Sequence, residues 1–378
     1  MSDYLSRARR IIVKVGSRLL VDGKTGALNH EWLASLVADL SSLKKEGKDV
    51  ILVSSGAVAL GRSALGSKAD SLRLEESQAA AAIGQVRLAQ AYVEAFQKHG
   101  LTAAQILLTL EDSERRRRYL NARETLRTLL QIGAVPVINE NDTVATAEIR
   151  FGDNDRLAAR VVSMIDADCL VLLSDVDGLY TANPQRDPAA KHIPEVPQIT
   201  PEIEAMAKGP VSGISRGGME SKVIAAKIAT AAGASVLICD GHLLHPLRAI
   251  VSLEKRTHFA PSLSPGAARK RWIAGGLSAQ GSITIDAGAE RALLSGKSLL
   301  PAGITVIEGR FDRGDLVVVR SADGRELARG LVAYSAEESR QIMGRRTVEI
   351  EDILGYRGPD EMIHRDDLAL ISTTNEHE

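Results

Sequence analysis

Two lysines stand in settings where an ammonium group needs a partner. Lys14 lies within the apolar run Arg10–Val15, and Gly16 and Ser17 follow this run directly. Burying an unpaired ammonium group is costly, so a phosphate beside a strand-end lysine would explain this position, and Gly16 would let backbone N–H groups approach the anion. A lysine whose side chain reaches solvent from the strand end explains this motif equally well.

The second lysine, Lys222, closes the stretch Gly213–Lys222 (GISRGGMESK). A loop with two adjacent glycines that opens a helix can hold a phosphate on the first N–H groups of that helix, as a P-loop does with a different spacing. A Gly-rich turn without any ligand remains the alternative.

Polar side chains also stand at the end of an apolar run, or at the start of an expected helix, at four further positions. They are Ser54-Ser55-Gly56, Asn139-Glu140-Asn141-Asp142, Gly152-Asp153-Asn154-Asp155 and Ser174-Asp175-Val176-Asp177. Small residues that open a helix suit an anion, and acidic residues suit a ligand ammonium group, the orientation of lysines, or Mg²⁺. Each motif alone could be a helix cap or a polar turn. Because nearly all of them fall where a strand ends or a helix begins, together they indicate one ligand site at a sheet edge.

The elements that must position these residues alternate along the chain up to about residue 250. The expected strands are Arg10–Val15, Asp49–Ser54, Thr102–Leu108, Ala134–Asn139, Cys169–Ser174 and Ser235–Cys239. The expected helices are Glu31–Glu46, Glu76–His99, Asn121–Ile132, Asp155–Ile165 and Met219–Ala232. Strands that are apolar throughout are typical of a sheet covered on both faces. The pattern therefore predicts an α/β fold, with a mainly parallel open sheet sandwiched by helices.

The composition and the pattern of the sequence change after residue 253. Residues 254–277 contain Pro, Ser, Gly and basic side chains without a clear period, which predicts a linker. The segments that follow are short and β-like, separated by Gly and Asp turns, and include 282–286, 303–309, 314–321, 326–334 and 348–353. We therefore expect a catalytic domain over 1–253, a small, mostly β domain over 278–362, and a tail over 363–378.

Composition and charge exclude several classes of protein. The 378 residues are 44% hydrophobic, and the two cysteines, Cys169 and Cys239, lie in apolar runs without metal-binding spacing. No apolar stretch suits a signal peptide or a membrane span, so we expect a cytoplasmic protein without a membrane partner. The P-loop, dinucleotide-binding and protein-kinase motifs are absent, so a nucleotide would bind in another way. Residues 1–277 carry a net charge of +5 and residues 278–378 carry −6, which favours the first part as the binder of a polyanion such as ATP.

Six motifs, in this order, resemble the amino acid kinase family. They are VKVGS (13–17), SSGAVA (54–59), LNARETLR (120–127), PVINENDTVATAEIRFGDND (136–155), LLSDVDGLYTANP (172–184) and GGMESK (217–222). The run over 136–155 is most similar to the members that phosphorylate the side-chain carboxylate of glutamate. The segments RWI (271–273), GSITIDAGA (281–289), SLLPAGI (298–304) and GDLVVV (314–319) resemble a PUA domain, which bacterial members of that group often carry.

Carried over position by position, the resemblance implies three sets of site residues. Lys14, Lys222 and Asp155 would be catalytic, with the lysines on the transferring phosphoryl group and Asp155 holding them in place. The ATP site would use Lys14, Gly16, Ser174, Asp175, Arg216, Gly217, Gly218, Met219, Glu220, Ser221 and Lys222. Glutamate would bind to Ser55, Gly56, Asp142 and Asn154. Arg216 departs from the family, which commonly has Thr there, and the metal ligands stay unknown.

The resemblance implies phosphorylation of the γ-carboxylate of L-glutamate with ATP and Mg²⁺, the first step of proline biosynthesis. It also implies proline as a feedback inhibitor, a homo-oligomer, and γ-glutamyl phosphate reductase as a partner that takes up the reactive product. The acidic loop over 139–142 itself favours free glutamate, because N-acetylglutamate lacks the α-ammonium group that the loop could bind.

Two other functions stay open at the level of sequence. The nearest is another kinase of the same family that acts on N-acetylglutamate, aspartate or carbamate. The other is an RNA-binding protein, since PUA domains commonly bind RNA. The net charge of −6 over 278–378 argues against RNA, because contacts to phosphate dominate such binding.

Overall fold

The computed structural model of the chain describes residues 4–23, 25–65, 72–144, 154–208, 218–250, 255–275 and 278–371. The chain divides into two compact units, Met1–Pro265 and Gly266–Glu378. Each unit has a hydrophobic core of its own.

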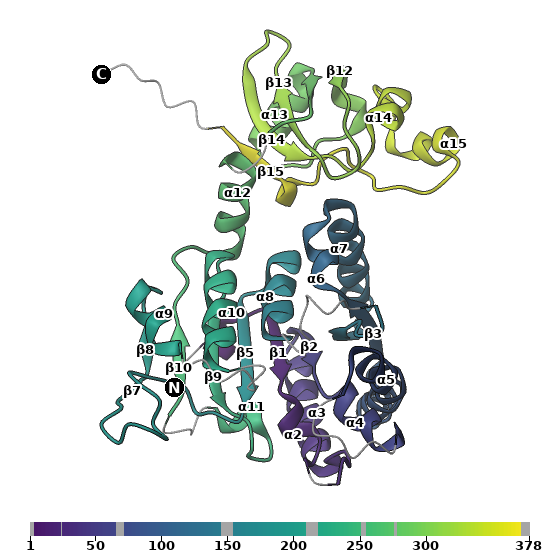
Figure 1. Ribbon diagram of the computed structural model, residues 1–378. Helices are drawn as coiled ribbons and strands as arrows, with labels where there is room; N and C mark the ends of the chain where they lie inside the picture. Colours follow the sequence, from purple (N-terminus) through teal and green to yellow (C-terminus); the bar gives the residue numbers. More distant parts are fainter. Residues whose placement is uncertain are drawn as a thin grey trace. The chain divides into compact units, whose positions relative to one another are not determined.

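The larger unit is built on an eight-stranded, mainly parallel sheet (Figure 1). Its strands are β1 (Arg10–Val15), β2 (Asp49–Ser54), β3 (Ala103–Leu108), β4 (Val135–Glu140), β5 (Cys169–Ser174), β8 (Glu195–Val196), β9 (Ser235–Asp240) and β10 (Thr257–Phe259). They lie in the order β3-β4-β2-β1-β5-β9-β10-β8, and β10 runs antiparallel to β9. Lys14 of β1 lies opposite Val53 of β2 and Leu172 of β5, so these three strands end at the same edge of the sheet.

Helices cover both faces of this sheet. One face carries α3 (His30–Lys45) and α5 (Leu74–Gln97), and the other carries α7 (Arg116–Gln131), α8 (Asn154–Ile165) and α10 (Met219–Ala231). Side chains of β1 alternate between the faces: Val13 and Val15 join the core under α3 and α5, whereas Ile12 joins the core under α7, α8 and α10. Lys14 therefore points to the second face, where α8 and α10 lie.

Two glycines bring α4 (Ala57–Arg62) and α5 into direct backbone contact. A Cβ atom on Gly84 would lie 1.8 Å from the carbonyl oxygen of Ala57, and one on Gly61 would lie 1.8 Å from that of Ala80. Neither position has room for any other residue, so the two helices are held in one relative placement. Gly56, just before α4, has a φ of +110°, which also favours glycine.

Shorter elements complete the larger unit. They are α1 (Tyr4–Arg7), α2 (Ser17–Leu20), α6 (Leu110–Glu114), α9 (Pro201–Ala207), α11 (Pro246–Ala249) and the antiparallel pair β6 (Leu179–Tyr180) and β7 (His192–Ile193). Among the described residues, none of the helices is both long enough and apolar enough to cross a membrane.

The smaller unit is a five-stranded sheet with helices. Its strands lie in the order β12 (Ile304–Gly309), β11 (Gly281–Ile285), β13 (Leu316–Arg320), β14 (Glu326–Leu331) and β15 (Leu368–Leu370). The helices are α13 (Ala287–Leu294), α14 (Ala336–Ile342) and α15 (Ile350–Leu354), and α12 (Pro265–Gly275) lies at the division between the units.

The predicted α/β fold with a small β-rich second unit is confirmed, and every expected strand and helix of the larger unit is present. The ends differ most at α7, which begins at Arg116 rather than Asn121. Three expectations are wrong, and all concern segments after residue 253. One of them is the tail over 363–378, because β15 lies within it and pairs with β14 of the smaller sheet.

The second wrong expectation is the irregular linker over 254–277. This stretch contains β10, which joins the large sheet beside β9, and α12. Phe259 of β10 is fully buried, but a strand of three residues is too short to leave a readable period.

The third is the expected strand over 348–353, which forms the end of a 3₁₀ turn and then α15. Glu351 and Asp352 stand in the first turn of α15, and Gly355 ends the helix with a φ of +75°. These start and stop signals outweigh the β-branched residues of the segment.

Candidate active site

A buried carboxylate joins two lysines that are distant in the sequence. Asp155 Oδ1 lies 2.6 Å from Lys14 Nζ, and Asp155 Oδ2 lies 3.0 Å from Lys222 Nζ. All three side chains are buried. The hydroxyl of Ser221 also donates to Asp155 Oδ2, at 3.0 Å. The structure thus brings together the three residues predicted to be catalytic.

Each of these residues is placed by the end of an element. Lys14 is the second-last residue of β1, Asp155 stands in the first turn of α8, and Lys222 stands in the first turn of α10. Both helices cover the sheet face to which Lys14 points. An aspartate is favourable in the first turn of a helix, because the N-terminal end of the helix carries a partial positive charge.

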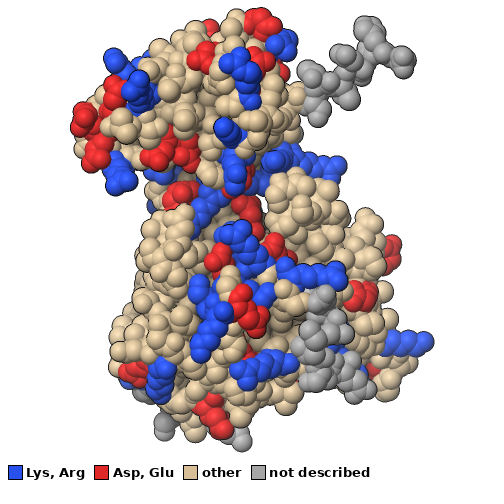
Figure 2. All heavy atoms as spheres, turned by 180° about the vertical axis from the view of Figure 1, so that it is seen from behind, with Lys and Arg blue, Asp and Glu red and all other residues tan. Residues whose placement is uncertain are grey.

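The cluster carries more positive than negative charge. Burial alone would raise the pKa of Asp155, but the ammonium groups of Lys14 and Lys222 lower it to about 2, so its carboxylate is ionised at neutral pH. Figure 2 shows basic and acidic side chains interspersed over the face that it draws. Lys14 and Lys222, in contrast, place two positive charges in the interior. A second anion that neutralised this excess would be bound strongly.

A chain of polar side chains lies beside the cluster. Asn154, the neighbour of Asp155, donates from Nδ2 to Ser55 Oγ at 3.0 Å and to Asn139 Oδ1 at 3.3 Å. Asn154 and Asn139 are both buried. Ser55 and Asn154, two of the residues predicted to bind glutamate, are therefore in direct contact, and Gly56 follows Ser55 in the chain.

Two acidic residues of the loop after β4 are buried as well. Glu140 and Asp142 are only 6% and 9% exposed. Burial, and then the charge of Glu140, raise the pKa of Asp142 to about 7. Such a carboxyl group gains from a cationic ligand, because an ammonium group would offset the repulsion between the two acids.

The described residues predicted to bind ATP lie at the ends of β1 and β5 and at the start of α10. Ser174 ends β5, and its hydroxyl donates to Asp175 Oδ1 at 3.1 Å. Gly218 caps α10, and Met219, Glu220, Ser221 and Lys222 form the first turn of this helix. Gly16 precedes α2, and its N–H donates to Leu173 O at 3.2 Å. Arg216 and Gly217 lie outside the described residues.

Sequence reasoning missed two contacts at this site. Arg18 Nη1 lies 2.6 Å from Asp175 Oδ2, although Arg18 stands only one residue after the VKVGS motif. Gln85 Oε1 accepts a hydrogen bond from Asn139 Nδ2 at 2.6 Å. Gln85 had no sequence signal, because it lies in an Ala-rich helix, and a single glutamine there is typical of a solvent-facing position.

Comparison with known proteins identifies the family. The sequence profile of the amino acid kinase family matches residues 9–240. The chain belongs to the amino acid kinase family. The profile of the PUA domain matches residues 281–354, within the smaller unit.

The amino acid kinases to which this chain is similar include three named glutamate 5-kinase. That of Paramagnetospirillum magneticum is 59% identical over 366 residues, which cover 97% of this chain and 99% of the relative. That of Agrobacterium fabrum is 58% identical, over 97% of this chain and 94% of the relative. That of Ruegeria sp. is 58% identical, over 97% and 99%. The resemblance found in the motifs is confirmed over nearly the whole chain.

Proposed function

We propose that this amino acid kinase transfers the γ-phosphoryl group of ATP to the side-chain carboxylate of L-glutamate. The product would be γ-glutamyl 5-phosphate, formed in the first step of proline biosynthesis. The observation that carries the proposal is the pair of buried lysines held on one carboxylate, in a chain whose relatives are named glutamate 5-kinase.

The reaction needs positive charge more than it needs a base. The side chain of glutamate has an ordinary pKa near 4.3, so the attacking carboxylate is already ionised at neutral pH. Its difficulty is the approach to a polyanionic triphosphate, which makes positioning and charge neutralisation the main tasks of the enzyme. Lys14 and Lys222 would contact the transferring phosphoryl group, and Asp155 would hold the two ammonium groups at a fixed separation.

The residues near Asn154 would bind the amino acid. Asp142, next to the second buried acid Glu140, would take the α-ammonium group of glutamate. Ser55, Gly56 and Asn154 would complete the site for the amino acid. A free α-ammonium group separates glutamate from N-acetylglutamate, so this acidic pair favours glutamate within the family.

The nucleotide would bind on the other side of the two lysines. Ser174 and Asp175 at the end of β5, together with the loop 216–222, would contact ATP. Among the described residues there is no group of three His, Cys, Asp or Glu side chains arranged to hold a metal ion, and both oxygens of Asp155 face lysines. This fits a Mg²⁺ ion that comes with the nucleotide phosphates, as is usual, and that adds positive charge when bound.

Other partners follow from the chemistry and the resemblance. An acyl phosphate is reactive, so γ-glutamyl phosphate reductase is the expected consumer of the product. Proline is the expected feedback inhibitor, and the enzyme is expected to be a homo-oligomer. These expectations rest on the resemblance to the family.

The test is ADP release together with trapping of the acyl phosphate by hydroxylamine. The purified chain would be offered glutamate, N-acetylglutamate, aspartate and carbamate in turn, with ATP and Mg²⁺. We expect a trapped hydroxamate with glutamate far above that with the other acceptors. A preference for any of the other three would contradict the proposed substrate, and no ADP release with any would contradict kinase activity. The variant Lys222→Ala tests the lysine pair in the same assay. Lys227→Ala is its matched control, because Lys227 lies on the same helix but is exposed.

A further inference from the structure

We infer that Gln85 of α5 is a positioning residue for the amino-acid site, which it orients through Asn139 and Asn154. The inference rests on the proposed function, because it takes Asn154 as a contact of the glutamate substrate. Gln85 is linked to Asn154 through Asn139, and among the described residues its side chain makes no hydrogen bond to Lys14, Lys222 or Asp155.

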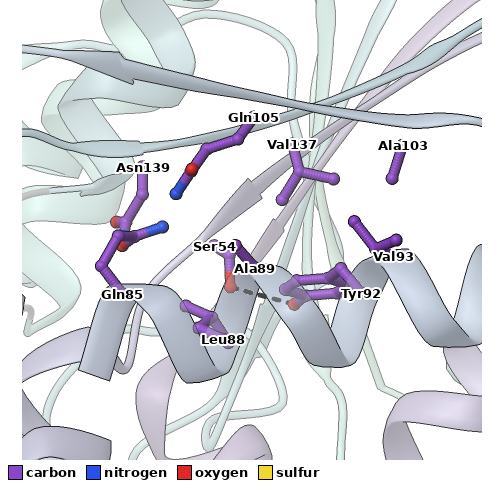
Figure 3. A pocket seen from close by; sticks show the side chains of 10 residues that line it. All are labelled: Ser54, Gln85, Leu88, Ala89, Tyr92, Val93, Ala103, Gln105, Val137 and Asn139. Carbon is purple, nitrogen blue, oxygen red and sulfur yellow. Dashed lines mark hydrogen bonds between the residues drawn. The ribbon is translucent and has the colours of Figure 1, made fainter. Parts of the chain in front are cut away.

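The first link is the bond between helix and sheet. Gln85 Oε1 accepts from Asn139 Nδ2 at 2.6 Å. Figure 3 shows the two side chains next to each other, Gln85 from α5 and Asn139 from β4, at one end of a small recess. Ser54 and Tyr92, joined by a hydrogen bond of 2.9 Å, also line this recess.

The second link is the orientation of the Asn139 amide. Its Oδ1 accepts from the backbone N–H of Glu140 at 2.9 Å and from Asn154 Nδ2 at 3.3 Å. The amide has a donor end and an acceptor end, so the acceptor Gln85 and the donor Glu140 N–H both require the same orientation. Without Gln85, only the bonds on the Oδ1 side would remain, and the recess would give the amide space to turn.

The third link is the free acceptor of Asn154. Its Nδ2 is used by Ser55 and Asn139, and its buried Oδ1 has no hydrogen-bond partner among the described residues. A buried acceptor without a partner is costly unless a ligand supplies a donor. The α-ammonium group of an amino acid is such a donor. If the Asn139 amide turned, Asn154 would lose one of the two bonds that keep its NH₂ group on the protein side and its oxygen available.

The backbone around Gln85 is suited to this role. The preceding residue, Gly84, lies in direct backbone contact with Ala57 of α4, and α4 begins one residue after Gly56. The helix that carries Gln85 is therefore fixed against the segment that carries Ser55. Because the backbone of this helix is fixed, the Gln85 side chain keeps its hydrogen bond to Asn139 in one direction.

The test compares two variants of similar size. Gln85→Met removes the acceptor, and Gln85→Glu keeps an acceptor oxygen for Asn139 Nδ2. Gln90→Met is the matched control, because Gln90 lies on the same helix and its Nε2 bonds Glu94 Oε1 at the surface, at 2.8 Å. Steady-state kinetics with glutamate and with ATP, binding of glutamate by calorimetry, and the thermal midpoint Tm would be measured for each.

We expect Gln85→Met to raise KM and Kd for glutamate about threefold to tenfold, the loss of one hydrogen bond, with KM for ATP and Tm little changed. Gln85→Glu should stay much closer to the unchanged chain, and Gln90→Met should not differ from it. Equal effects of Met and Glu at residue 85, no effect of either, or a parallel loss of Tm and of both KM values would overturn the inference. If the unchanged chain does not phosphorylate glutamate, the proposed function fails. This outcome differs from a failure of the inference about Gln85, in which the unchanged chain is active.

Discussion

Replacing Asp155 with asparagine removes the negative charge that Lys14 and Lys222 share while it keeps the shape of the side chain. The two ammonium groups would stay buried, at present 2.6 and 3.0 Å from the Asp155 oxygens, without this counter-charge. A buried cation that loses its partner is strongly destabilising, and two of them would also repel each other. We therefore expect Asp155→Asn to lower both the free energy of unfolding and kcat.

The size of the effect on stability follows from the pKa of Asp155. Burial raises this pKa and the two lysines lower it, with a net change from 3.8 to about 2. One pKa unit corresponds to about 1.4 kcal/mol, so the ionised carboxylate contributes about 2 to 3 kcal/mol at neutral pH. Because the side chain is almost fully buried, little of this is lost to solvent screening. Asp155→Asn should therefore lower the free energy of unfolding at pH 7 by about 2 to 3 kcal/mol or more.

The dependence of stability on pH tests separately whether the Asp155 carboxylate stabilises the fold. The folded-state pKa is depressed, so this contribution is complete above the unfolded-state value near 4 and disappears as pH falls toward 2. Urea unfolding at pH 7, 4 and 3 should show the gap between the unchanged chain and Asp155→Asn shrinking, to roughly half at pH 3. Glu204→Gln, which removes the exposed partner of Lys227, is the control and should change stability by less than about 1 kcal/mol. A variant as stable as the unchanged chain at pH 7, or a gap that does not depend on pH, would refute the reasoning.

Four further predictions concern the site and the helices beside it. Lys222→Ala should lower kcat by about a hundredfold or more with smaller changes in KM, and a loss confined to KM would argue against a role in the transition state. Asp142→Ala should raise KM for glutamate much more than KM for ATP, and equal effects on both would count against the assignment. The pKa of Asp142 is about 7 in the folded state, so burial of this side chain lowers the stability of the fold increasingly as pH rises from 4 to 7. Asp142→Asn should therefore raise Tm more at pH 8 than at pH 4, and equal shifts would contradict this. Gly84→Ala would place a Cβ 1.8 Å from Ala57 O and should cost at least about 1 to 3 kcal/mol in urea unfolding, and a neutral effect would exclude the tight contact.

Much of the fold could be predicted because its signals are local. The strands of a sheet covered on both faces are short apolar runs, and β1, β2 and β5 begin and end where these runs do. Polar side chains at strand ends marked the carboxyl edge, so Lys14 and Lys222 could be assigned to one site before any contact was known. The missed β10 has only three residues, and its place beside β9 depends on tertiary pairing alone.

The rest of the site could not be predicted, because it depends on distant packing. Gln85 is half-buried on a long helix, and nothing in the adjacent sequence indicates that it faces Asn139. The close contact at Gly84 joins two helices, and glycine in a helix usually indicates only a weak helix former. The burial of Glu140 and Asp142 likewise depends on elements that surround the end of β4. Sequence motifs identified the residue types, and the three-dimensional contacts then determined how these residues act on each other.

The central claim is that Lys14 and Lys222 act together on one transferring phosphoryl group. A double-mutant cycle of Lys14→Ala and Lys222→Ala, followed by the rate of γ-glutamyl phosphate formation in a single turnover at saturating substrates, tests it most directly. Lys14 and Lys222 share Asp155 and the same phosphoryl group, so their effects on the rate should be coupled. The transition-state stabilisation lost by the double variant should therefore differ from the sum of the two single losses by about 0.5 to 3 kcal/mol. Additive losses, or single-turnover rates that neither variant changes, would contradict the account.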